Sequence, residues 1–127
     1  MAAQNPIGWF EIYVTDMDRA QKFYETVLGV SLIELPNPEG TTGKMMAFPG
    51  DENAPGASGC LVKDEMGAPS ANGTLIYFVC EDCAVELARV EAAGGKVITP
   101  KMDIGDFGFC GIASDTEGNS IGLHSMQ

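Results

Sequence analysis

Glu11 and His124 are the two side chains of this sequence that are best placed for proton transfer. Glu11 alternates with Trp9 and Tyr13 along an apolar stretch, and a carboxylate on such a strand face is a candidate general acid or base. His124 is the only histidine, and an imidazole can shuttle a proton near neutral pH. Structural roles stay open for both: Glu11 as the partner of a lysine or a rim amide, and His124 as an ordinary residue at a strand end.

The four cysteines suggest two other kinds of chemistry. Cys80 and Cys83 form a CEDC motif, which fits a redox pair or half of a zinc site. The sequence contains no second CxxC motif and its only histidine is distant in the chain, so we expect reduced, structural cysteines. Cys60 and Cys110 are candidates to line a cavity, although a reactive thiolate also needs a cationic neighbour.

Composition excludes several classes of partner. The chain has 127 residues, a net charge of −11 and 45% hydrophobic residues, which indicates one globular domain over residues 1–127. This charge would repel nucleic acid and anionic membranes, so neither is expected as a partner. No apolar run is long enough to span a bilayer, and the opening MAAQNP lacks the features of a signal peptide. We therefore expect a cytoplasmic protein.

The position of Glu11 depends on the strand and helix that are predicted within residues 7–29. Residues 8–14 alternate in character, so Glu11 lies on one face of a predicted strand, and the opposite face consists of Phe10, Ile12 and Val14. Asp16 is suited to cap the N-terminus of a helix. Apolar residues then recur at three- and four-residue steps as far as Gly29, which is suited to a left-handed C-terminal cap. The even-numbered strand face is therefore predicted to pack under this helix.

The same pattern returns 66 residues later, where Asp82 corresponds to Asp16 and Gly95 to Gly29. A second strand is predicted at 73–80 and a second helix at 83–93. The strand residues expected to face the helix are Ile76, Phe78 and Cys80, and those expected on the other face are Leu75, Tyr77 and Val79. Further strands are predicted at 30–35, 44–48, 60–63, 96–98, 107–113 and 120–124. The expected fold is α+β, with two tandem βαβββ modules at about 5–65 and 72–126.

Three segments resemble the vicinal oxygen chelate superfamily, the group of glyoxalase I, extradiol dioxygenases and bleomycin-resistance proteins. They are FEIYVTDMDRAQKFYETVLGV, VEAAGGKV and DTEGNSIGL. The resemblance implies paired βαβββ modules whose sheets curl into an open cup, with the helices outside. It also implies a homodimer, because many members are dimers. It identifies the reaction poorly, since this fold supports several chemistries and pure binding.

The resemblance further implies a divalent metal held by His, Glu or Gln on the first and last strands of each module. In this chain the corresponding positions are Trp9, Leu75, Gly122 and, in a looser alignment, Cys60. Tryptophan, leucine and glycine side chains provide no ligand for a hard divalent ion, and one cysteine does not make a zinc site. We therefore expect no metal and no other cofactor.

The leading hypothesis is a protein that binds a small apolar or aromatic molecule in its cup. The predicted ligand-binding residues are Trp9, Tyr13, Cys60, Leu75, Tyr77, Val79 and Gly122, and the predicted catalytic residues are Glu11 and His124. Three alternatives stay open. The protein could be a metal-independent lyase or isomerase with Glu11 as base, a metalloenzyme that uses Glu11 and His124 in new places, or an interaction module with a closed cup.

Overall fold

The computed structural model describes residues 5–36, 43–51 and 53–127, and within them the chain forms two βαβββ units. The first unit contains β1 (Trp9–Tyr13), α1 (Met17–Leu28), β2 (Ile33–Leu35), β3 (Lys44–Ala47) and β4 (Ser58–Lys63). The second contains β5 (Ile76–Val79), α2 (Cys83–Arg89), β6 (Lys96–Asp103), the 3-10 turn η1 (Gly105–Phe107), β7 (Phe109–Ser114) and β8 (Ser120–Ser125). The predicted α+β fold is confirmed.

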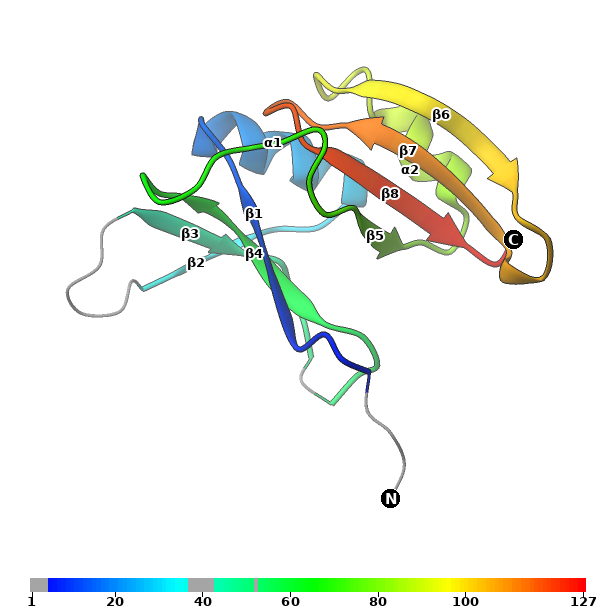
Figure 1. Ribbon diagram of the computed structural model, residues 1–127, viewed down its shortest axis with the longest axis horizontal. Helices are drawn as coiled ribbons and strands as arrows, with labels where there is room; N and C mark the ends of the chain where they lie inside the picture. The colour runs from blue at the N-terminus through cyan, green and yellow to red at the C-terminus, as the bar shows by residue number, and fades with distance from the viewer. Residues whose placement is uncertain (1–4, 37–42, 52) are drawn as a thin grey trace.

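Each unit builds its own four-stranded sheet, in the orders β1-β4-β3-β2 and β5-β8-β7-β6. β1 runs parallel to β4 and β5 parallel to β8, while the remaining neighbours are antiparallel. The two sheets diverge, with α1 between them and α2 against the second sheet (Figure 1). Consequently β1 and β5 are edge strands of separate sheets. No helix in the described part of the chain is both long and apolar enough to cross a lipid bilayer.

Helix α1 forms as its sequence predicts. The Asp16 side chain accepts a hydrogen bond from the backbone N–H of Arg19 at 3.1 Å, which satisfies one of the amides left free at a helix start. Gly29 ends the helix in the left-handed region with φ 69°, and its N–H donates to the carbonyl of Glu25. Glycine adopts this conformation without steric cost.

Two predicted boundaries in the second unit are wrong. Helix α2 ends at Arg89 rather than at residue 93, and the chain turns before Gly94, which has φ 97°. Strand β6 continues through Pro100 to Asp103, whereas the predicted strand ended at residue 98. Proline is tolerated here because β6 is the edge strand and its pairing with β7 is irregular between Val97 and Met102.

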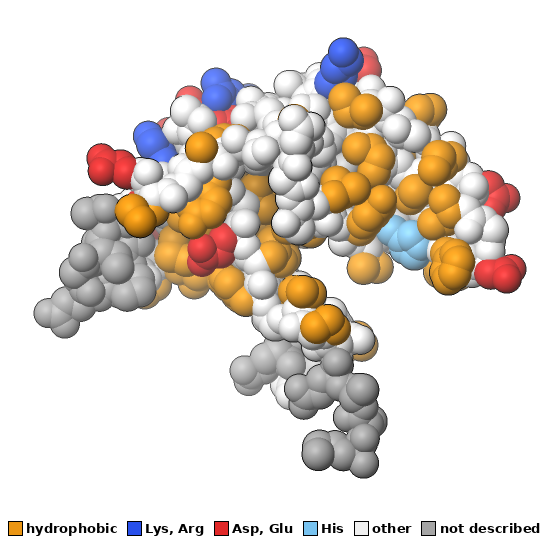
Figure 2. All heavy atoms as spheres, viewed as in Figure 1, with side chains coloured by type: hydrophobic (Ala, Val, Ile, Leu, Met, Phe, Trp, Pro, Cys, Tyr) orange, Lys and Arg blue, Asp and Glu red, His pale blue; other side chains and the backbone are white. Residues whose placement is uncertain are grey.

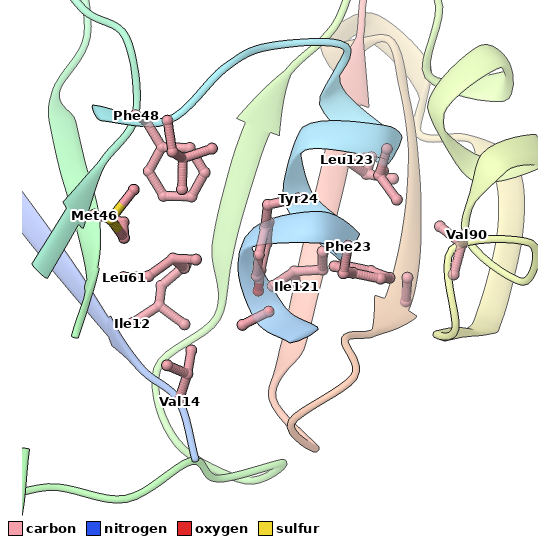
Figure 3. Close-up of a cluster of buried hydrophobic side chains, with 14 of the residues drawn as sticks. Ile12, Val14, Phe23, Tyr24, Met46, Phe48, Leu61, Val90, Ile121 and Leu123 are labelled. Carbon is pink, nitrogen blue, oxygen red and sulfur yellow. The ribbon is translucent and has the colours of Figure 1, made fainter. Parts of the chain in front are cut away.

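One hydrophobic core is shared by the two units. It contains Ile12 and Val14 from the first unit, with Phe10 packed against it, and Ile76 and Phe78 pack against it from the second. Helix α1 lies at its centre, where Tyr24 and Phe23 stand between residues of the two sheets (Figure 3). The predicted alternation is confirmed in both strands, because the even-numbered residues face the helices.

The turn at residues 115–119 joins the two units. The hydroxyl of Tyr24 donates to Asp115 Oδ2 at 2.6 Å, and Asn119 Nδ2 donates to the carbonyl of Tyr13 at 2.9 Å. Glu117 Oε1 accepts from the backbone N–H of Asp16 at 2.7 Å, and Glu117 Oε2 accepts from Arg19 Nε at 2.7 Å. The turn at residues 115–119, which belongs to the segment DTEGNSIGL of the family resemblance, therefore holds the two units together through hydrogen bonds.

Candidate functional site: a cleft between two edge strands

A cleft of about 1090 Å³ lies between the two sheets. Its lining comes mainly from β1, from the loop before β4, and from β5 with the residues before it. The molecular surface is indented between the two lobes that carry these segments (Figure 2). Ligand sites for small molecules typically enclose roughly 300–1,000 Å³, so this open cleft is large enough for one organic molecule.

The cleft is mainly aromatic and aliphatic. Of the residues predicted to contact a ligand, five line it, and they are Trp9, Tyr13, Leu75, Tyr77 and Val79. Trp9 is 45% exposed and Tyr77 is 47% exposed, so each ring offers part of its surface to a molecule in the cleft. Large aromatic rings with free surface are effective anchors for an organic ligand.

Three phenylalanines also reach the cleft, and two of them, Phe10 and Phe78, were assigned to the core by the alternation. Phe10, Phe48 and Phe78 line the cleft, and their ring centroids are separated by 5.5–6.1 Å. Sequence reasoning missed this role because it assigned each strand face entirely to one side. An edge strand such as β1 or β5 has no neighbour on its outer side, so a cavity beside it can touch both of its faces.

Glu11 lines the cleft, but its side chain is exposed rather than desolvated as the hypothesis of a buried base requires. Its strand neighbour Cys60 is fully buried and is not among the residues that line the cleft. Burial, and then the Glu11 carboxylate, raise the pKa of the Cys60 thiol to about 11. Cys60 is therefore a protonated core thiol.

Gly122 and His124 lie on the second sheet and are not among the described residues that line the cleft. Gly122 is paired with Tyr77, and a Cβ at Gly122 would overlap the Tyr77 ring, so glycine makes room for that ring. His124 Nε2 is 2.6 Å from the carbonyl oxygen of Phe107. Glu11 and His124 therefore belong to different sheets, and only Glu11 borders the cleft.

The residues at the implied metal positions do not fit a divalent ion. Trp9 and Leu75 supply no ligand atom, and Gly122 has no side chain. Cys60 is a single donor whose thiol stays protonated. No group of three or more His, Cys, Asp or Glu side chains that could hold a metal ion occurs in the described part of the chain.

The CEDC motif makes no disulfide, since all four cysteines are free. Burial, and then the carboxylate of Glu86, raise the pKa of the Cys80 thiol to about 12. A thiol that stays protonated at neutral pH is a poor nucleophile. Glu86 itself lines the cleft from α2, and sequence reasoning did not single it out because an acidic residue on a short helix usually faces water.

The family model described as the Glyoxalase/Bleomycin resistance protein/Dioxygenase superfamily matches residues 6–123 of this chain. Among curated proteins, "Putative glyoxylase CFP32" of Mycobacterium bovis is 29% identical over 122 residues, and a protein of the same name occurs in Mycobacterium tuberculosis at the same identity. The alignment covers 94% of this chain and 45% of that relative. The chain thus spans about half the length of the curated relatives it matches.

Solved structures share the fold at low sequence identity. A glyoxalase/bleomycin resistance protein from Albidiferax ferrireducens superposes with a TM-score of 0.71 at 18% identity, over 95% of this chain and 98% of that one. A variant of glyoxalase I from Zea mays gives a TM-score of 0.73 at 20% identity, over 95% of this chain and 47% of that one. These similarities establish the arrangement of the two units.

Proposed function

Because this chain belongs to the glyoxalase/bleomycin resistance protein/dioxygenase superfamily, we propose that it binds a small apolar or aromatic molecule in the cleft, without the metal of related enzymes. The observation that carries the proposal is the cleft of about 1090 Å³ with Trp9, Tyr13 and Tyr77 in its lining. The absence of metal-binding side chains at Trp9, Leu75 and Gly122 supports the second part.

Apolar contact is sufficient for a useful affinity. An aromatic ligand that buries roughly 250 Å² of its apolar surface away from water would gain about 6 kcal/mol of binding free energy, at about 25 cal/mol per Å². Contacts made by the protein's own rings add to this gain, and the lost freedom of the ligand subtracts from it. A dissociation constant in the range of roughly micromolar to hundreds of micromolar follows.

Binding has more support than catalysis. The alternative is a metal-independent lyase or isomerase with Glu11 as general base. A base of raised basicity would need a desolvated carboxylate, whereas Glu11 is exposed and His124 lies beside Phe107 rather than in the cleft lining. An interaction module with a closed cup would not need the open cleft beside Trp9.

We propose a homodimer on separate grounds. On the side of the second sheet that faces away from the helices, Ile98 and Met102 form an exposed apolar patch that continues from the cleft residues Tyr77 and Val79. Figure 2 shows hydrophobic side chains, in orange, gathered around the one histidine, in pale blue. A contiguous exposed apolar patch is typical of a contact surface between proteins.

A cytoplasmic location is consistent with four free thiols.

Trp9 makes the binding proposal directly testable, because it is the only tryptophan. Its emission should change saturably when an aromatic ligand fills the cleft, in a screen of aromatic metabolites and antibiotics. Isothermal titration of the hits should show Trp9→Ala weakening the affinity by about 10- to 100-fold, as is usual for an aromatic anchor. Met66→Ala is the control, since Met66 is exposed and outside the cleft lining. Equal affinity in Trp9→Ala would contradict the proposed site.

A further inference from the structure

The charged residues that line the cleft are all acidic. They are Glu11, Asp51 and Glu86. The chain has seven Lys and Arg residues and one His, every one of which falls in the described part, and none of them lines the cleft. The cations lie elsewhere, for example Arg19 against Glu117 and Lys101 against Asp82.

Of these three acids, Glu86 has a buried carboxylate oxygen that lacks a hydrogen-bond donor in the part of the chain that the structure describes. It projects from α2 one residue before Leu87, which is buried in the core. Its Oε1 atom is shielded from solvent and accepts no hydrogen bond from the described residues. An enclosed carboxylate oxygen without a donor costs free energy that a bound donor would recover. The neighbouring Cys80 thiol forms a side-chain hydrogen bond with the Glu86 carboxylate, but it provides no positive charge.

Aromatic rings provide the second attraction for positive charge. Trp9 and Tyr77 border the cleft from opposite sheets, with Phe10 and Phe78 behind them. The face of an aromatic ring attracts a cation electrostatically, and most strongly where water is displaced. The net charge of −11 adds a general attraction for cations.

We propose that the cleft selects an organic cation, an aromatic or alkyl amine whose ammonium group is directed to Glu86 while its apolar body lies against the aromatic rings. This inference rests on the proposed function, because it specifies the class of molecule that the same cleft binds. Three acids and no basic side chain in the lining, together with the unpartnered Glu86 oxygen, favour an ammonium ion over a carboxylate or phosphate.

The test compares three probes that share a phenylethyl group by isothermal titration at 0.15 M salt, namely 2-phenylethylamine, 2-phenylethanol and the slightly larger 3-phenylpropanoate. The amine should bind at least 10-fold more tightly than the alcohol, and the carboxylate should bind most weakly. Glu86→Gln should remove most of the preference for the amine while leaving the affinity for the alcohol within about twofold. Glu91→Gln removes the same charge at an exposed residue outside the lining and should keep the preference.

Failure of the inference differs from failure of the proposed function. Equal binding of amine and alcohol, or an unchanged preference in Glu86→Gln, would overturn the cation inference and leave the binding function in place. Failure of all three probes to bind would also overturn the cation inference, whereas the proposed function would fall only if the Trp9 fluorescence screen found no ligand either. Glu86→Ala, checked by circular dichroism, repeats the measurement in a variant that keeps no amide acceptor.

Discussion

The hydroxyl of Tyr24 donates a 2.6 Å hydrogen bond to Asp115 Oδ2 across 91 residues of sequence, and both residues are buried. Tyr24 lies on α1 of the first unit and Asp115 begins the turn between β7 and β8 of the second. Burial, and then the Asp115 carboxylate, raise the pKa of Tyr24 well above its ordinary value. The phenol therefore stays a neutral donor at any physiological pH and joins the two units.

Tyr24→Phe should lower the free energy of unfolding by about 1–3 kcal/mol, because it removes a donor from a buried carboxylate. Asn119 Nδ2 still donates to the same oxygen at 3.0 Å, which limits the loss. Urea unfolding followed by circular dichroism measures the effect. Tyr77→Phe is the control, since the Tyr77 side chain is half exposed. An unchanged stability in Tyr24→Phe would show that this bond does not help to join the units.

The lowered pKa of Glu117 predicts that the free energy of unfolding depends on pH in the acid range. Burial alone would raise its pKa, but hydrogen bonds from Arg19, the backbone N–H groups of Asp16 and Thr15, and Thr116 lower it from 4.5 to about 2. A carboxyl whose pKa is lower in the folded protein stabilises the fold above its unfolded pKa. This contribution should be fully present above about pH 4.5 and should be lost as the pH falls toward about 2.

Glu117→Gln should therefore destabilise the protein at pH 7 and flatten its loss of stability between about pH 4.5 and pH 2. Unfolding measured at several pH values detects both changes. Glu91→Gln, an exposed acid, should keep the slope of the parent protein. If the free energy of unfolding falls as steeply with decreasing pH in Glu117→Gln as in the parent protein, the acid sensitivity comes from other carboxylates.

Gly122→Ala tests the packing of the cleft wall. The added methyl group would overlap the Tyr77 ring, so we expect a loss of about 1–3 kcal/mol in stability and weaker ligand binding, because Tyr77 must move. The double variant Gly122→Ala/Tyr77→Ala should be more stable than the sum of the single effects predicts. Strict additivity would mean that the two residues do not interact in solution.

The exposed patch on the second sheet predicts a homodimer. Ile98 is 53% exposed, and a charge at its position should disrupt an apolar contact between two copies. Analytical ultracentrifugation should show a dimer of the parent protein and a shift toward monomer in Ile98→Glu. Val85→Glu, at an exposed position on α2, should leave the assembly unchanged. A monomeric parent protein would assign the patch another role.

The sequence was sufficient for those parts of the fold that depend on local patterns. Asp16 and Gly29 mark the ends of α1 because capping depends on a few adjacent residues. The alternation in β1 and β5 correctly separated core residues such as Ile12 from cleft residues such as Trp9. The length of β6 was missed because the tolerance for Pro100 depends on its position at a sheet edge.

The candidate site was only partly predictable, because the cleft lies beside two edge strands and not over the whole concave face. Alternation placed Gly122 and His124 on the same side of the sheet as Tyr77, but it could not show that the cleft ends before them. It also could not show that Phe10 reaches the cleft from the core side. Glu86 becomes visible only when α2 is packed against the second sheet and one of its carboxylate oxygens is enclosed.

The central claim is that the cleft binds a small molecule. Mapping NMR chemical-shift changes by residue tests this claim most directly. Backbone ¹⁵N–¹H spectra of the protein, recorded during titration with the tightest hit of the fluorescence screen, locate the bound molecule by residue. We predict saturable shifts at Trp9, Tyr77, Phe78 and Glu86, and none at Met66. Saturable shifts confined to residues outside the cleft, such as Ile98 and Met102, would contradict the account.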